Sequence, residues 1–117
     1  MFIVNGTDIT LTRGDTGTLT LTATGYTFDT SDRAVFTIKD ANGTEIKRQQ
    51  AEMTNGSFDV DFLNADTEGL APGMYNWDVR YVIGPYYDAD GRIINGDQVV
   101  TPNQPMNLHL INAVGEV

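Results

Sequence analysis

Cysteine is absent from the 117-residue chain, which excludes disulfides, thiolate nucleophiles and cysteine-bound zinc. Histidine occurs once, and the sequence holds no nucleophile elbow, no zinc-protease motif and no phosphate-binding loop. Basic residues are also scarce, with seven Lys and Arg against sixteen Asp and Glu and a net charge of -9. The electric field of this negative charge repels phosphate groups and anionic lipids. Nucleic acids and membrane surfaces are therefore poor candidate partners. We therefore predict a protein without enzymatic activity and without a cofactor.

Long apolar runs are missing too. The opening residues "MFIVNG" include no basic n-region, and their apolar run is too short for a signal peptide. No other stretch approaches the length of a membrane span. We expect synthesis in the cytoplasm with no signal peptide or transmembrane segment, and a single domain over residues 1–117, since domains cluster near this size.

What the sequence does have is strict alternation of apolar and polar residues. "FDVDF" is the clearest case, with Phe58, Val60 and Phe62 on one side and aspartates on the other. "AVFTI" likewise sets Ala34, Phe36 and Ile38 against Val35 and Thr37. The same period of two recurs in "ITLT", "LTLTA", "YNWDVRY" and "MNLHL". This pattern is typical of half-buried antiparallel strands that have one packed face and one wet face.

Turn signals separate these runs. Asn-Gly, a strong hairpin signal, occurs at 5–6, 42–43, 55–56 and 95–96. The sequences Asp40–Gly43 and Asp88–Gly91 predict slightly longer hairpin loops, and "NADTEG" at 64–69 predicts one helical turn. Together the strands and turns predict an all-β, antiparallel β-sandwich of about seven to nine strands. Three of the Asn-Gly pairs also form glycosylation sequons, which we interpret as turns only.

Three acidic or basic side chains are candidates for a catalytic site. Asp59 and Asp61 lie two apart on one strand face, roughly 7 Å from each other by strand geometry. They could serve an enzyme only if they lined a concave pocket, and a solvated face explains them more simply. His109, beside Asn107 on the polar face of the last strand, has no nucleophile to activate.

The segment "DADGRIINGD" offers possible calcium ligands. It does not match the EF-hand pattern, because the glycine comes fourth and the closing glutamate is missing. A hairpin tip is the simpler interpretation, and a weak site of another kind stays open. Its candidate ligands are Asp88, Asp90, Asn95 and Asp97.

Two adjacent tyrosines supply the first choice for a contact surface. Tyr86 and Tyr87 are predicted to form an aromatic loop between two strands, with Asp88 and Asp90 nearby. Exposed tyrosines beside acids can stack on sugar rings or anchor a protein interface. The same residues could instead cap one end of the core.

The segment "LAPGMYNW" predicts a structural corner. A tyrosine at the mouth of a strand, after a tight turn, is typical of the tyrosine corner, in which the phenol bonds to the backbone just upstream. Gly73 would supply the turn residue for Tyr75, while Leu70 and Trp77 pack below. Loss of that bond would cost about 1 kcal/mol.

Two motifs together resemble a known family. The chain is similar to small immunoglobulin-like β-sandwich proteins of phage and prophage structural operons, among them the N-terminal domain of phage baseplate upper proteins. The first motif is the Gly-Asp-Thr corner within "LTRGDTGTLTLT", and the second is the segment "DTEGLAPGMYNWD". The matching positions are Gly14, Asp15, Thr16, Asp66, Thr67, Leu70, Gly73, Tyr75 and Asp78. The region 83–105 is longer than in that pattern.

The resemblance implies a non-enzymatic structural or assembly protein of a phage tail or baseplate. It would be made in the bacterial cytoplasm, become a virion component, and act through contacts with other virion proteins or with copies of itself. The terminal segments "MFIVNG" and "NLHLINAVGEV" are candidates for an oligomer interface. The alternative is a carbohydrate- or surface-binding module that uses Tyr86 and Tyr87. The tripeptide Arg13-Gly14-Asp15 is interpreted as a tight corner between strands rather than an adhesion motif.

Overall fold

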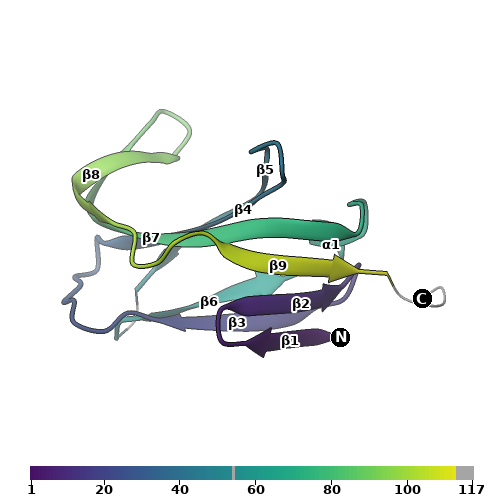
Figure 1. Ribbon diagram of the computed structural model, residues 1–117. Coiled ribbons are helices and arrows are strands. Elements are labelled where there is room, and N and C mark those ends of the chain that lie inside the picture. The colour runs from purple at the N-terminus through teal and green to yellow at the C-terminus, as the bar shows by residue number, and fades with distance from the viewer. Residues whose placement is uncertain (54, 113–117) are drawn as a thin grey trace.

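The computed structural model describes residues 1–53 and 55–112, which form nine strands and one short helix (Figure 1). In chain order these elements are β1 (Phe2–Asn5), β2 (Asp8–Thr12), β3 (Gly17–Thr22), β4 (Arg33–Lys39), β5 (Glu45–Glu52), β6 (Ser57–Phe62), α1 (Asn64–Thr67), β7 (Gly73–Tyr87), β8 (Ile93–Val100) and β9 (Met106–Ile111). The all-β class, the strand number and the single helical turn are therefore as predicted.

Two sheets face each other. The larger has the order β1-β2-β9-β7-β4-β5, with β8 also paired to β7, and the smaller consists of β3 and β6. Figure 1 shows β3 and β6 lying beneath β9 and β7. One pair departs from the antiparallel prediction: β2 runs parallel to β9, with Ile9 opposite Leu108. Alternation cannot reveal this, because the direction of a pair depends on the long connection between its strands and not on their faces.

The main core fills the space between the sheets. Most residues predicted to face inward are buried, including Ile9, Leu11, Phe36, Val60 and Leu110, each at most 1% exposed, while Leu21 and Ala23 are only partly buried. Aromatic rings tie the sheets together. The Phe36 ring centroid lies 5.5 Å from Trp77 and 6.1 Å, edge to face, from Phe62 of the small sheet.

The outer face of β4 differs from the prediction. Val35 was expected on a wet face, yet it is only 4% exposed and packs with Val82 and Ile93 in a second, small cluster. The cause is the hairpin formed by β7 and β8, which extends beyond β4 and bends over this face (Figure 1). Burial of Val35 thus depends on a strand about sixty residues further along the chain.

Three of the four Asn-Gly pairs lie in turns. The pairs at 5–6 and 42–43 close the β1–β2 and β4–β5 hairpins, while the pair at 55–56 leads from β5 to β6. Asp88–Gly91 forms the predicted hairpin tip, in which Asp88 N donates to Arg92 O at 2.9 Å.

The turn predicted at Asn95-Gly96 is wrong, because both residues lie inside β8 opposite Pro85 and Tyr86. A Cβ on Gly96 would lie 2.5 Å from Val82 Cγ1 and 2.9 Å from the Ile83 carbonyl oxygen. Glycine is needed here for the close approach of two strands and not for a turn.

Candidate functional site

The predicted tyrosine corner is present. The Tyr75 hydroxyl donates to the Ala71 carbonyl oxygen at 2.6 Å, and Gly73 has a φ of +146°, a conformation that favours glycine. Leu70 is half-buried against the core, and Trp77 is 3% exposed. These four residues shape the entry to β7.

The Arg13-Gly14-Asp15 corner is held from several sides. Gly14 N donates to Thr67 Oγ1 at 2.8 Å, and Asn64 Nδ2 donates to the Gly14 carbonyl oxygen at 2.8 Å. Asp15 N bonds back to Thr12 O at 2.9 Å, while its carboxylate pairs with the N-terminal amino group. The two motifs quoted for the family resemblance therefore meet in space. An adhesion tripeptide works at a mobile tip, whereas this one is a fixed corner.

The predicted contact surface is exposed but is not a loop. Tyr86 and Tyr87, 50% and 47% exposed, are the last two residues of β7, because β8 pairs with them through Asn95 and Ile93. Consecutive strand residues project from opposite faces, so the two rings do not form one flat platform. The Tyr86 hydroxyl donates to the Asp97 carboxylate, and this bond raises the pKa of Tyr86.

The possible calcium ligands are not brought together. Asp88 uses one carboxylate oxygen to accept the N–H groups of Asp90 and Arg92, at 2.9 and 3.0 Å. Asn95 bonds its neighbour Gly96, and Asp97 is engaged by Tyr86. Within residues 1–53 and 55–112, no cluster of three or more His, Cys, Asp or Glu could hold a metal ion.

The remaining polar candidates lie on solvated faces. Asp59 and Asp61 are exposed, as predicted, and accept hydrogen bonds from Thr20 and Thr18 of the neighbouring strand at 2.7 and 2.9 Å. His109 is exposed on the outward face of β9. The two aspartates thus stabilise cross-strand pairs between β3 and β6.

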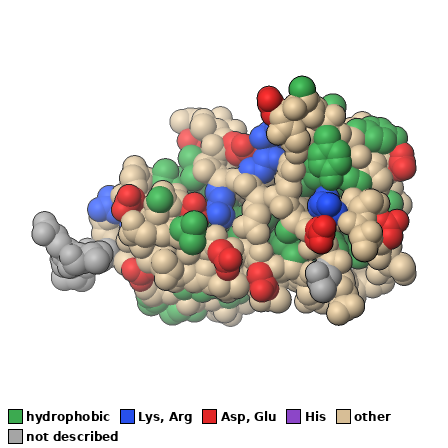
Figure 2. Space-filling view, turned by 180° about the vertical axis from the view of Figure 1, so that it is seen from behind, with side chains coloured by type: hydrophobic (Ala, Val, Ile, Leu, Met, Phe, Trp, Pro, Cys, Tyr) green, Lys and Arg blue, Asp and Glu red, His purple; other side chains and the backbone are tan. Residues whose placement is uncertain are grey.

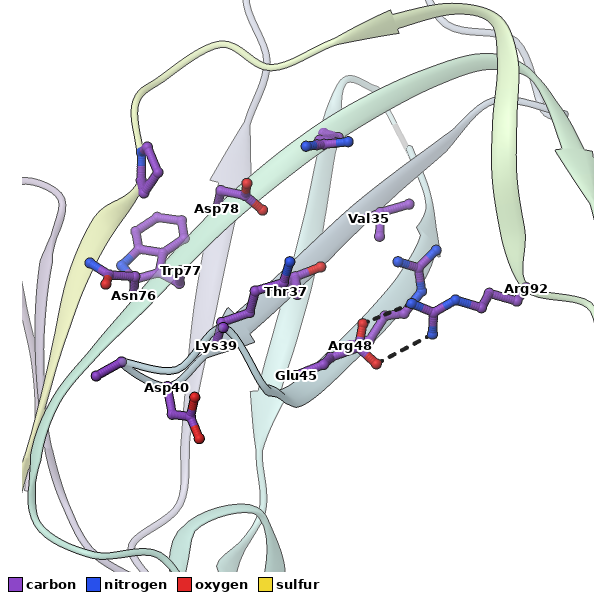
Figure 3. Close-up of a pocket in the computed structure, with 14 residues that line it drawn as sticks. Val35, Thr37, Lys39, Asp40, Glu45, Arg48, Asn76, Trp77, Asp78 and Arg92 are labelled. Carbon is purple, nitrogen blue, oxygen red and sulfur yellow. Dashed lines mark hydrogen bonds and ion pairs between the residues drawn. The ribbon is translucent and has the colours of Figure 1, made fainter.

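Sequence reasoning missed a hollow of about 490 Å³ on the outer face of β4, β5 and β7 (Figure 3). Four of the chain's seven basic residues line it: Lys39, Arg48, Arg80 and Arg92. The register explains their meeting, since Arg80 lies opposite Val35 and Arg48 lies opposite Thr37. Alternation alone places Arg80 outward, but the strand order that brings Arg48 and Arg92 beside it is not visible in the sequence.

Charge within the hollow is partly balanced. Arg92 Nη2 lies 2.9 Å from Glu45 Oε1, and this contact lowers the pKa of Glu45 and raises that of Arg92. Arg48 donates to the Ile93 carbonyl oxygen at 2.9 Å, while its Nε is buried with no partner. Burial, and then the positive charge of Arg92, lower the pKa of the Arg48 guanidinium.

A second uncovered surface lies around β1. Ile3, Thr10, His109 and Met74 are aligned across β1, β2, β9 and β7, and Ile3 and Met74 are 50% and 54% exposed. Val4 on the same edge strand is 42% exposed. Residues 113–117, the end of the second predicted interface segment, lie outside the described residues.

No protein-family model matches this chain, and no curated protein matches it. Among the described residues, no helix has the length and apolar character to cross a membrane.

Proposed function

We propose that this protein is a non-enzymatic assembly component that acts through protein–protein contacts at the β1 edge of its larger sheet. The observation that carries the proposal is an edge strand with exposed apolar side chains, Ile3 and Val4. Folded monomers commonly protect such edges with lysine, proline or bulges, and β1 has none of these.

The backbone of β1 offers free hydrogen-bonding groups. In the described chain β1 pairs only with β2, and the Met1 carbonyl accepts Thr12 N at 2.9 Å. Because bonding alternates along an antiparallel pair, Phe2 and Val4 direct their N–H and C=O groups away from β2. A further strand can add to this edge and use those groups.

The side chains beside the edge suit a contact with a protein. The aligned row of Ile3, Thr10, His109 and Met74 carries no carboxylate, although the whole chain has a net charge of -9. Depletion of charge at the centre is typical of interface cores. A second copy of the chain can approach here with less repulsion than elsewhere on its surface.

The setting we propose is the tail or baseplate of a phage, with the partner a second copy or another virion protein. Support for it comes from the Gly-Asp-Thr corner and the tyrosine-corner segment, which resemble those of phage structural proteins. The hydrogen bond from Gly14 N to Thr67 Oγ1 joins the two motifs in the folded chain.

The test is the solution mass of the purified chain by light scattering over a range of concentrations. We expect an oligomer that Ile3→Lys shifts toward the monomer, because a lysine on a free edge opposes strand addition. Ile94→Lys is the matched control, since Ile94 is 64% exposed on β8, away from β1. A monomer at every concentration would contradict self-association through β1.

Carbohydrate binding is the second candidate, favoured by the half-exposed rings of Tyr86 and Tyr87 beside acidic groups. A glycan screen of the monomeric chain, repeated on Tyr86→Ala and Tyr87→Ala, tests it. Because the rings project from opposite faces of β7, only one of the two substitutions is expected to abolish binding to a single sugar.

A further inference from the structure

The basic residues of this acidic chain are unevenly distributed. Four of its seven Lys and Arg line one hollow, although the chain carries sixteen Asp and Glu. Figure 2 shows acidic side chains spread over much of one face, with Lys and Arg in only a few places. Gathering like charges costs free energy unless opposite charges meet them.

Two of the three acidic groups at the hollow already have partners. Glu45 pairs with Arg92, and Asp40 accepts the N–H groups of Asn42 and Thr44, each at 2.9 Å, within its own turn. Asp78, opposite Thr37, is the remaining carboxylate of the lining. The four basic residues of the lining therefore exceed its three carboxylates by one positive charge.

Two arginines retain unused donors. Arg80 makes no hydrogen bond or ion pair with any described residue through its guanidinium. Arg48 bonds Gln50 and the Ile93 carbonyl through one nitrogen, which leaves its buried Nε without an acceptor. Figure 3 shows the side chains of Arg48 and Arg92 next to each other, beside the strand that carries Val35 and Thr37.

We propose that this hollow is an anion-binding site, in which Arg48 and Arg80 hold one carboxylate or phosphate group over Val35 and Thr37. A guanidinium presents paired N–H donors that match two oxygens of such a group. Burial, and then the positive charges of Arg92 and Arg80, lower the pKa of Arg48, and a bound anion would offset the repulsion from those two charges. This inference stands apart from the β1 edge, and neither depends on the other.

The experiment is an NMR titration at constant ionic strength, following the backbone amides and the arginine Nε–H signals. Inorganic phosphate and acetate probe a free small anion, and a capped glutamate peptide probes an acidic side chain of a protein. We expect saturable shifts at Arg48, Arg80 and Thr37. The probe with the highest affinity identifies the source of the group.

Arg80→Gln should weaken binding of the best probe about tenfold or more, as expected for loss of a charge-assisted hydrogen bond. Arg13→Gln is the matched control, because Arg13 lies outside the hollow and its guanidinium donates a long bond of 3.5 Å to Leu70 O. Arg80 is exposed, so its substitution should leave the fold intact and the backbone amide signals away from the hollow unchanged. Shifts that do not saturate with any probe, or equal affinity in Arg80→Gln and the unaltered chain, would overturn the proposal.

Discussion

The two faces of β4 are buried in different ways. Its inner residues Ala34, Phe36 and Ile38 belong to the large core between the two sheets. On its outer face, Val35 is buried only with Val82 and Ile93, under the bent β7–β8 hairpin. The inner face is covered by a second sheet, whereas the hairpin covers the outer face only around Val35 and leaves the hollow open beside it. We therefore expect the outer cluster to open more easily than the core.

The largest effect should come from the inner face. Phe36→Ala removes a fully buried ring that contacts Phe62 and Trp77, and should lower the free energy of unfolding by about 3–5 kcal/mol. Chemical denaturation measures this loss. Thr37→Ala, at the next and half-buried position, is the control and should change stability far less.

A smaller loss is expected at the outer cluster. Ile93→Ala should cost about 2 kcal/mol, at the low end for this substitution, because a hairpin can settle into the space more readily than two packed sheets. Hydrogen exchange should quicken at the amides of β8 and not at those of β3 and β6. A loss as large as that of Phe36→Ala would contradict the distinction between the faces.

Close packing of β7 against β8 predicts the next effect. Gly96→Ala places a Cβ against Val82 and the Ile83 carbonyl, and should destabilise the protein by about 1–2 kcal/mol. Gly69→Ala is the matched control, since a Cβ there meets no atom within 4 Å. Equal thermal midpoints for the two variants would show that β8 shifts freely on β7.

The smallest effect concerns the ion pair at the rim of the hollow. The bond to Arg92 lowers the pKa of Glu45 in the folded protein. The ion pair therefore stabilises the fold at pH values above 4.5, the ordinary pKa of this carboxyl group. The contribution is lost as the pH falls through the lower pKa that Glu45 has in the folded protein. Because both side chains are substantially exposed, Glu45→Gln should cost only about 0.5 kcal/mol at neutral pH. Denaturation curves of the two proteins should converge in acid; a constant difference would contradict the ion-pair explanation.

The inner core and the tyrosine corner were predictable because their causes are local. Alternation places Phe58, Val60 and Phe62 on one face whatever the partner strand is. The tyrosine corner is equally local, since its hydrogen bond joins residues four positions apart. The turn at Asn95-Gly96 failed for the opposite reason, because glycine also serves where two strands approach closely.

By itself, the sequence determined which residues face inward, where most turns lie, and that the chain folds without disulfides. Tertiary structure alone decided the parallel β2–β9 pair, the burial of Val35 and the gathering of Arg48, Arg80 and Arg92 at one hollow. The physical reason is range. A strand's period of two is a property of neighbouring residues, whereas strand order and the bend of a hairpin depend on contacts between segments far apart in the chain.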